Sequence, residues 1–171
     1  KNLYFGKGLN RFKHSGIGSN QRFTNLQASI GLAQLEKIRQ IVKKKLSIGN
    51  YYTKKLSLIS NKINLPLTSV KYCKNIHWVY GVVIKDNIKL NASRAITILK
   101  KNGIDCRPFF YPMHIQPIYK KMKLFDNTKF PISEKISKKG FYIPSGLGIT
   151  RGEQDIVINK IEQTKKNIAD E

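Results

Sequence analysis

A long helical periodicity is the feature that most limits what this sequence can fold into. Apolar residues recur at steps of three and four through residues 26–59. They are Leu26, Ile30, Ala33, Ile38, Ile41, Leu46, Tyr52, Leu56 and Ile59. This spacing is typical of a helix with one buried face. We therefore expect a long amphipathic helix over residues 25–60, with Thr24 or Asn25 as its N-cap and a bend near Gly49.

The residues before this helix show neither helical nor strand periodicity. Residues 1–24 are polar and interrupted by glycines, so we expect a loop. The sequence starts at Lys1 rather than at a methionine, and its first residues lack the apolar stretch of a secretory leader. The chain is therefore expected to be a leaderless piece of a longer protein.

From Asn61 onward, the pattern alternates between strands and helices. β-branched and aromatic runs predict strands over residues 76–84, 104–110 and 141–143, the first of them buried on both faces for much of its length. Helices are expected over residues 92–101, 133–139 and 151–167. The sequence thus predicts the α/β class, with a small sheet and helices packed on it.

Capping residues mark the ends of these helices. Asn91 is a good N-cap for the first, and Asn102-Gly103 is a typical C-terminal signal. Gly140 is expected to end the second helix. Thr150 and Glu153 have the spacing of a capping box at the start of the third.

The charge balance is unusual. Lys and Arg number 32 against 10 for Asp and Glu, which gives a net charge of +22. Such an excess of positive charge is typical of proteins that bind nucleic acid or an anionic membrane. However, the lysines are spread along the whole chain and accompany many Ile and Asn residues, as an AT-rich coding sequence would produce. We expect a solvated surface and neither nucleic acid nor membrane as a partner, with a non-enzymatic nucleic-acid-binding domain as the alternative from another class.

The two cysteines and the apolar runs limit the cellular setting. Cys73 and Cys106 form neither a metal-ligand pattern nor a disulfide framework, so no metal site and reduced thiols are expected. No stretch approaches the roughly 18 uninterrupted apolar residues of a membrane-spanning helix. The expected location is the cytoplasm.

Three segments carry more polar and aromatic detail than packing requires. Residues 18–25 precede the long helix, where backbone amides, Asn20 and Arg22 suit an anion such as a phosphate. The alternative is an ordinary capped helix with Arg22 in a salt bridge. In the second segment, His77-Trp78, the histidine is expected to be a hydrogen-bonded core residue of a strand.

The third segment is a loop stiffened by Pro108 and Pro112. It displays Arg107, Tyr111, Met113 and His114, and could stack on a base or sugar ring and pair with a diphosphate. The alternative is a strand end whose aromatic side chains complete the core, which is the preferred interpretation for Phe109. No Ser/His/Asp order, P-loop or GxGxxG motif occurs.

Taken together, these segments resemble the sugar aminotransferases named after DegT, DnrJ, EryC and StrS. Residues 20–36 (NQRFTNLQASIGLAQLE) are similar to the family stretch that enters the helix between its two domains. Residues 107–119 (RPFFYPMHIQPIY) match the family loop Arg-Pro-x-x-x-Pro-x-His-x-Gln-Pro-x-Tyr. Ile143-Pro144-Ser145-Gly146 resembles its closing Leu-Pro-Ser-x motif. Gln21 departs from the pattern, because the family usually has an aromatic residue there.

The resemblance implies a fold type I enzyme that uses pyridoxal 5'-phosphate. Such an enzyme moves an amino group from glutamate to the keto carbon of a nucleotide sugar. It also implies three parts: a loop remnant of the large cofactor domain (1–24), a long interdomain helix (25–60) and a small C-terminal domain (61–171). The family's cofactor lysine lies before the matched region. We therefore expect no catalytic residue in this chain, which alone should be inactive.

Site residues follow from the same resemblance. It places Asn20 on the cofactor phosphate of a neighbouring subunit, with Arg22 supporting that segment or meeting an anionic group. Arg107, Tyr111, Met113 and His114 would line the nucleotide-sugar pocket. A homodimer that shares its active sites between subunits is implied.

The sequences of residues 76–83 and 109–114 most resemble those of the perosamine synthases of this family, which aminate GDP-4-keto-6-deoxymannose for surface polysaccharide or glycan synthesis. The alternative within the family is a UDP- or dTDP-keto sugar.

Overall fold

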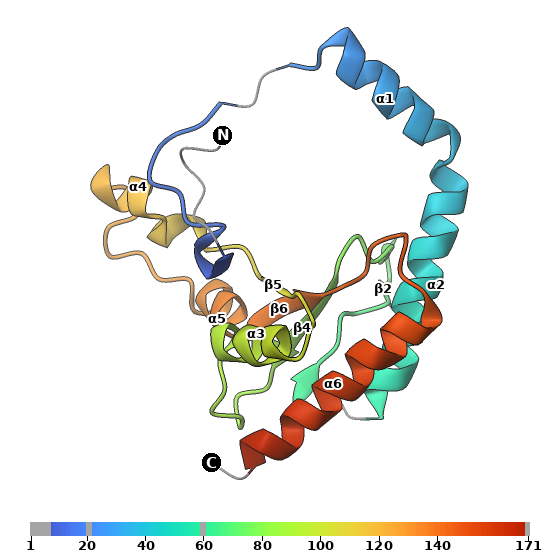
Figure 1. Ribbon diagram of the computed structural model, residues 1–171. Coiled ribbons are helices and arrows are strands. Elements are labelled where there is room, and N and C mark those ends of the chain that lie inside the picture. Colours follow the sequence, from blue (N-terminus) through green and yellow to red (C-terminus); the bar gives the residue numbers. More distant parts are fainter. Residues whose placement is uncertain (1–7, 20–21, 59–60, 170–171) are drawn as a thin grey trace.

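The computed structural model describes residues 8–19, 22–58 and 61–169. Two helices in series, α1 (Asn25–Glu36) and α2 (Ile38–Ser57), lead into a body built on a small antiparallel sheet. Figure 1 shows α1 extending away from the body, while the C-terminal half of α2 lies beside α6. The predicted class, a small sheet with helices packed on it, is confirmed.

The sheet has the strand order β1-β4-β6-β5. Its strands are β1 (Ile63–Asn64), β4 (Tyr80–Ile84), β6 (Gly140–Ile143) and β5 (Arg107–Pro108). The central pair, β4 and β6, runs antiparallel with Tyr80 opposite Ile143. A separate hairpin joins β2 (Ser69–Val70) to β3 (Cys73–Lys74).

The helices of the body are α3 (Ala92–Lys101), α4 (Pro117–Lys121), α5 (Pro131–Lys139) and α6 (Arg151–Ala169). Two short 3₁₀ turns, η1 (Gly8–Asn10) and η2 (Met113–Ile115), complete the structure. One core joins α2, α3 and α6 to the sheet, with Tyr52, Leu56, Tyr80, Leu99 and Ile143 at its centre. None of the helices in the described part of the chain is long and apolar enough to cross a membrane.

The predicted caps are confirmed. Thr24, rather than Asn25, caps α1: its hydroxyl accepts from the Gln27 N–H at 3.3 Å, and the Gln27 side chain accepts from the Thr24 N–H at 2.9 Å. Asn91 caps α3 by accepting from the Arg94 N–H at 2.9 Å. The N–H groups of Thr150 and Glu153 each bond the other residue's side chain at the start of α6.

The expected long helix is interrupted at Lys37, while α2 continues as regular helix through Gly49. At Lys37 the backbone N–H bonds the carbonyls of Gln34 and Leu35 instead of continuing the i−4 pattern. Gly49 lies buried within α2, and a Cβ at this position would overlap the His77 ring. The glycine therefore allows the His77 ring to pack closely against α2.

The predicted strands over residues 76–84 and 104–110 are both too long. The backbone of His77 is left-handed, with φ at 53°, so the first strand begins only at Tyr80. On it Tyr80, Val82 and Ile84 are buried while the alternate residues are half-buried, so burial is complete on one face only. In the second, Pro108 has no N–H for the ladder, and only Arg107–Pro108 pair with β6.

Local patterns did not predict the two-residue strands β1, β2 and β3 or the short helix α4. Helix α5 begins two residues earlier than expected, at Pro131, and α6 ends two residues later, at Ala169. The expected loop at the start of the chain contains one turn of 3₁₀ helix, η1.

Candidate functional site

Arg107 lies at the start of β5, beside a small hollow. Its guanidinium pairs with Asp105, with Nη2 and Oδ2 2.8 Å apart. A hollow of about 250 Å³ is lined by both residues and by Lys45, Trp78 and Ser145. Lys45 donates to the Ser145 carbonyl at 2.6 Å, and burial lowers the pKa of this lysine. Lys45 and Arg107, two cations from distant parts of the sequence, thus line the same hollow.

Tyr111 lies in a different hollow, of about 570 Å³, lined by residues of the N-terminal segment, the 107–117 loop and α5. The ammonium of Lys13 lies 5.2 Å from the centre of the Tyr111 ring. At this distance a cation is attracted to the face of the ring. Arg107 and Tyr111 therefore face separate hollows despite their closeness in sequence.

His114 and Met113 share the turn η2 but differ in burial. His114 is buried, with Nε2 2.9 Å from Oε1 of Glu134. That oxygen also accepts from the Phe130 N–H at 3.2 Å. The hydrogen bond from His114 is the main cause of a lowered pKa at Glu134. Met113 is exposed, so only Met113 presents its side chain at the surface.

The structure adds Gln116, to which the sequence assigned no role. Its buried side chain donates from Nε2 to the carbonyls of Phe12 at 2.8 Å and Tyr111 at 3.2 Å. Its Oε1 accepts from the His14 N–H at 2.9 Å. Gln116 thus fastens the N-terminal segment to the 107–117 loop. Gln116 is one of the named residues of the family loop motif, and this was the available signal.

Phe109 is half-buried on the sheet and does not belong to the buried core, to which the core interpretation assigned it. Its ring covers Gly81 of β4 and Gly140 of β6, and a Cβ at either glycine would overlap the ring. The two glycines allow an aromatic side chain to lie directly on the sheet.

Of the two residues predicted at the cofactor, only Arg22 is described, and it is not brought to the 107–117 loop. Asn20 lies outside the described residues. Arg22 is exposed just before α1, whose N-terminal end lies far from β5 (Figure 1).

His77 is a core residue, but the expectation of a hydrogen-bonded one is wrong. Its side chain is 1% exposed, and neither ring nitrogen has a hydrogen-bond partner among the described residues. The ring stacks on Tyr80 at 5.6 Å. Burial, helped by the charge of Lys45, lowers the pKa of His77 and so favours the neutral ring.

Metal ligands and disulfides do not shape the described part of the chain. No group of three His, Cys, Asp or Glu residues there could hold a metal ion. Cys73 is exposed and Cys106 is buried, and both are free thiols.

Comparison with known proteins identifies the family. The model of the DegT/DnrJ/EryC1/StrS aminotransferase family matches residues 3–162. The chain belongs to this family. Two GDP-perosamine synthases are each 30% identical to it: that of Vibrio cholerae over 89% of this chain and 40% of its own length, and that of Caulobacter vibrioides over 94% and 43%. The chain thus spans about two fifths of these curated relatives.

Solved structures of sugar aminotransferases share the fold. The chain superposes on PseC of Helicobacter pylori, an aminotransferase involved in pseudoaminic acid biosynthesis, with a TM-score of 0.75 and 16% identity. This match covers 96% of the chain and 43% of PseC. The PMP-form of a putative sugar aminotransferase of Streptococcus pneumoniae gives a TM-score of 0.74 and 18% identity over 86% of the chain and 36% of its own length.

Proposed function

We propose that the chain is the C-terminal part of a pyridoxal-phosphate-dependent aminotransferase. It would act on the keto carbon of a nucleotide-linked deoxy sugar, with glutamate as the amino donor. The observation that carries this proposal is the similarity to two GDP-perosamine synthases over about nine tenths of the chain. It favours GDP-4-keto-6-deoxymannose as the substrate and GDP-perosamine as the product, for surface polysaccharide or glycan synthesis.

A second candidate substrate comes from the same family. A dTDP-4-amino-4,6-dideoxy-D-glucose transaminase of Escherichia coli is 25% identical over 80% of the chain. A dTDP- or UDP-keto sugar is therefore the alternative, and the higher identity of the perosamine synthases favours the GDP-linked sugar.

Cofactor binding is proposed for the segment before α1. Pyridoxal phosphate, when bound, supplies the electron sink for moving an amino group between donor and keto sugar. The exposed Arg22 beside a helix N-terminus fits its phosphate group, because guanidinium groups and helix amides both favour anions. Asn20 is proposed as a further phosphate ligand, toward the cofactor of a neighbouring subunit. The lysine that holds the cofactor is proposed to lie outside these 171 residues.

Substrate binding is proposed for the 107–117 loop. The exposed or half-exposed side chains of Arg107, Tyr111 and Met113 would contact the nucleotide sugar. His114, buried against Glu134, would hold the loop in position for this contact. Three further features stay predictions. They are the division into a loop remnant (1–24), an interdomain helix (25–60) and a small domain (61–171), a homodimer with a shared active site, and a cytoplasmic location.

Separating the two half-reactions of the complete protein tests the proposal. Glutamate should convert the bound cofactor to its amine form, seen as a change in its absorbance spectrum. GDP-4-keto-6-deoxymannose should then restore the spectrum and yield an amino sugar, detected by mass spectrometry. Conversion of a dTDP- or UDP-keto sugar alone would overturn the GDP assignment, and no conversion of any keto sugar would overturn the proposed function.

Arg107→Ala tests the role of the loop in the same assay. We expect an apparent KM for the nucleotide sugar about tenfold or more higher, because a hydrogen bond to a charged group contributes about 1.5–3 kcal/mol. The glutamate half-reaction should be nearly unchanged. Equal damage to both half-reactions would contradict a nucleotide-sugar site at this loop.

A further inference from the structure

Trp78 is a large aromatic side chain held in solvent. It is 69% exposed, although a buried tryptophan would contribute far more to the stability of a core. It is also the single tryptophan of the chain. A large exposed aromatic ring of this kind is a candidate surface for binding a ligand.

The backbone before Trp78 holds this side chain outward. The backbone of His77 is left-handed, with φ at 53°, and its buried ring has no hydrogen-bond partner among the residues that the structure describes. Both features cost free energy and persist only where other contacts hold the residue in place. Asn75 accepts from the His77 N–H at 2.7 Å and donates to the Leu67 carbonyl at 2.9 Å. With His77 fixed inward against Gly49, its neighbour Trp78 is left at the surface.

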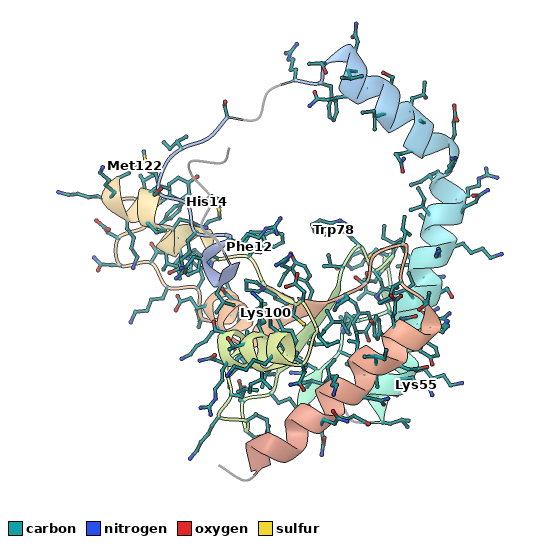
Figure 2. All side chains as sticks on the ribbon, viewed as in Figure 1. Phe12, His14, Lys55, Trp78, Lys100 and Met122 are labelled. Carbon is teal, nitrogen blue, oxygen red and sulfur yellow. The ribbon has the colours of Figure 1, made fainter. Side chains whose placement is uncertain are left out.

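Trp78 belongs to a row of aromatic rings. Its ring is nearly parallel to that of Phe110, at an angle of 10° and with centroids 6.4 Å apart. Phe110 is 55% exposed, and its other neighbour is Phe12, 4.6 Å away. Figure 2 shows Phe12 and Trp78 on the side of the body that faces α1. We call the two nearly parallel exposed rings of Trp78 and Phe110 the aromatic platform, and Phe12 contacts its Phe110 ring.

Positive charge lies directly beside this platform. Trp78 forms one wall of the 250 Å³ hollow that also contains Lys45 and Arg107. The hollow has the size for phosphate groups and is too small for a whole nucleotide. Asp105 now pairs with Arg107, but a half-exposed ion pair of this kind is weak and can exchange its carboxylate for a phosphate oxygen.

We propose that Trp78 and Phe110 stack on the base of a nucleoside diphosphate whose phosphates bind Lys45 and Arg107. This inference rests on the proposed function and names residues that would hold the nucleotide end of its substrate. Every base has a flat π-face, so the platform supplies affinity, while polar contacts elsewhere must select the base.

Calorimetric titration of the protein with GDP tests the platform. Because stacking on one aromatic side chain contributes roughly 1–3 kcal/mol, Trp78→Ala should weaken GDP binding about tenfold. Trp78→Phe keeps a flat ring and should retain affinity within about threefold. Tyr72→Ala is the matched control, since Tyr72 is 89% exposed on the β2–β3 turn and does not line the hollow. This variant should bind GDP normally.

Fluorescence separates the platform from simple phosphate attraction. The difference in fluorescence between the wild type and Trp78→Phe is the emission of Trp78. GDP should quench this emission in a saturable way. Pyrophosphate should compete with GDP without quenching. Unquenched emission at saturating GDP, or equal affinities of Trp78→Ala and Tyr72→Ala, would overturn the platform.

The glutamate half-reaction distinguishes this failure from failure of the proposed function. If Trp78→Ala binds GDP normally while glutamate and keto sugar are still converted, only the platform is wrong. If GDP binds through Trp78 but no keto sugar is aminated, the platform stands and the aminotransferase proposal fails.

Discussion

Gln116 shows how much of the loop geometry depends on one side chain. Its amide bonds three backbone groups, those of Phe12, His14 and Tyr111, and so joins the N-terminal segment to the loop. Leaving buried polar groups unpaired costs about 1–3 kcal/mol, so we expect Gln116→Ala to lower the free energy of unfolding by about that amount in urea denaturation. Gln163→Ala, an exposed glutamine on α6, is the control and should change little. Equal unfolding curves for the two variants would show that Gln116 does not fasten the segment.

Among the elements, the turn η2 and helix α5 are joined by the contact of His114 with Glu134. Hydrogen bonds from His114 and from the Phe130 backbone lower the pKa of Glu134 from its usual 4.5. A carboxylate with a lower pKa in the folded state stabilises the fold above its unfolded pKa and loses this contribution as pH falls through the folded pKa. We therefore expect Glu134→Ala to melt at a lower temperature than the wild type near neutral pH, with the difference shrinking below pH 4.5. Thermal melts across this range check the prediction, with the exposed Glu162→Ala as control. A difference that is constant with pH would contradict it.

At the scale of the whole molecule, the net charge of +22 is the property most open to misinterpretation. The basic side chains that have assigned partners hold the fold: Lys139 bonds the carbonyls of Ile88 and Leu90, and Arg151 bonds Ser47. If the remaining lysines only solvate the surface, binding to duplex DNA should be weak and should fall steeply with salt, because phosphate neutralisation alone drives it. Fluorescence anisotropy with labelled DNA at rising salt measures this. Sequence-selective binding that survives about 200 mM salt would favour the nucleic-acid-binding alternative.

The sequence by itself determined the elements whose ends are set by neighbouring residues. Helix α3 has the predicted bounds because Asn91 and Asn102-Gly103 act within one turn, and α6 begins where Thr150 and Glu153 bond each other. The family could also be predicted from the sequence, because its motifs are contiguous stretches of residues.

Tertiary structure decided the rest. His114 is buried because Glu134 reaches it from α5, and Gln116 contacts a segment more than a hundred residues away. His77 turns inward because Gly49, on another element, leaves space for its ring, and this same packing leaves Trp78 in solvent. Local patterns do not contain such partners, since the fold alone brings them together.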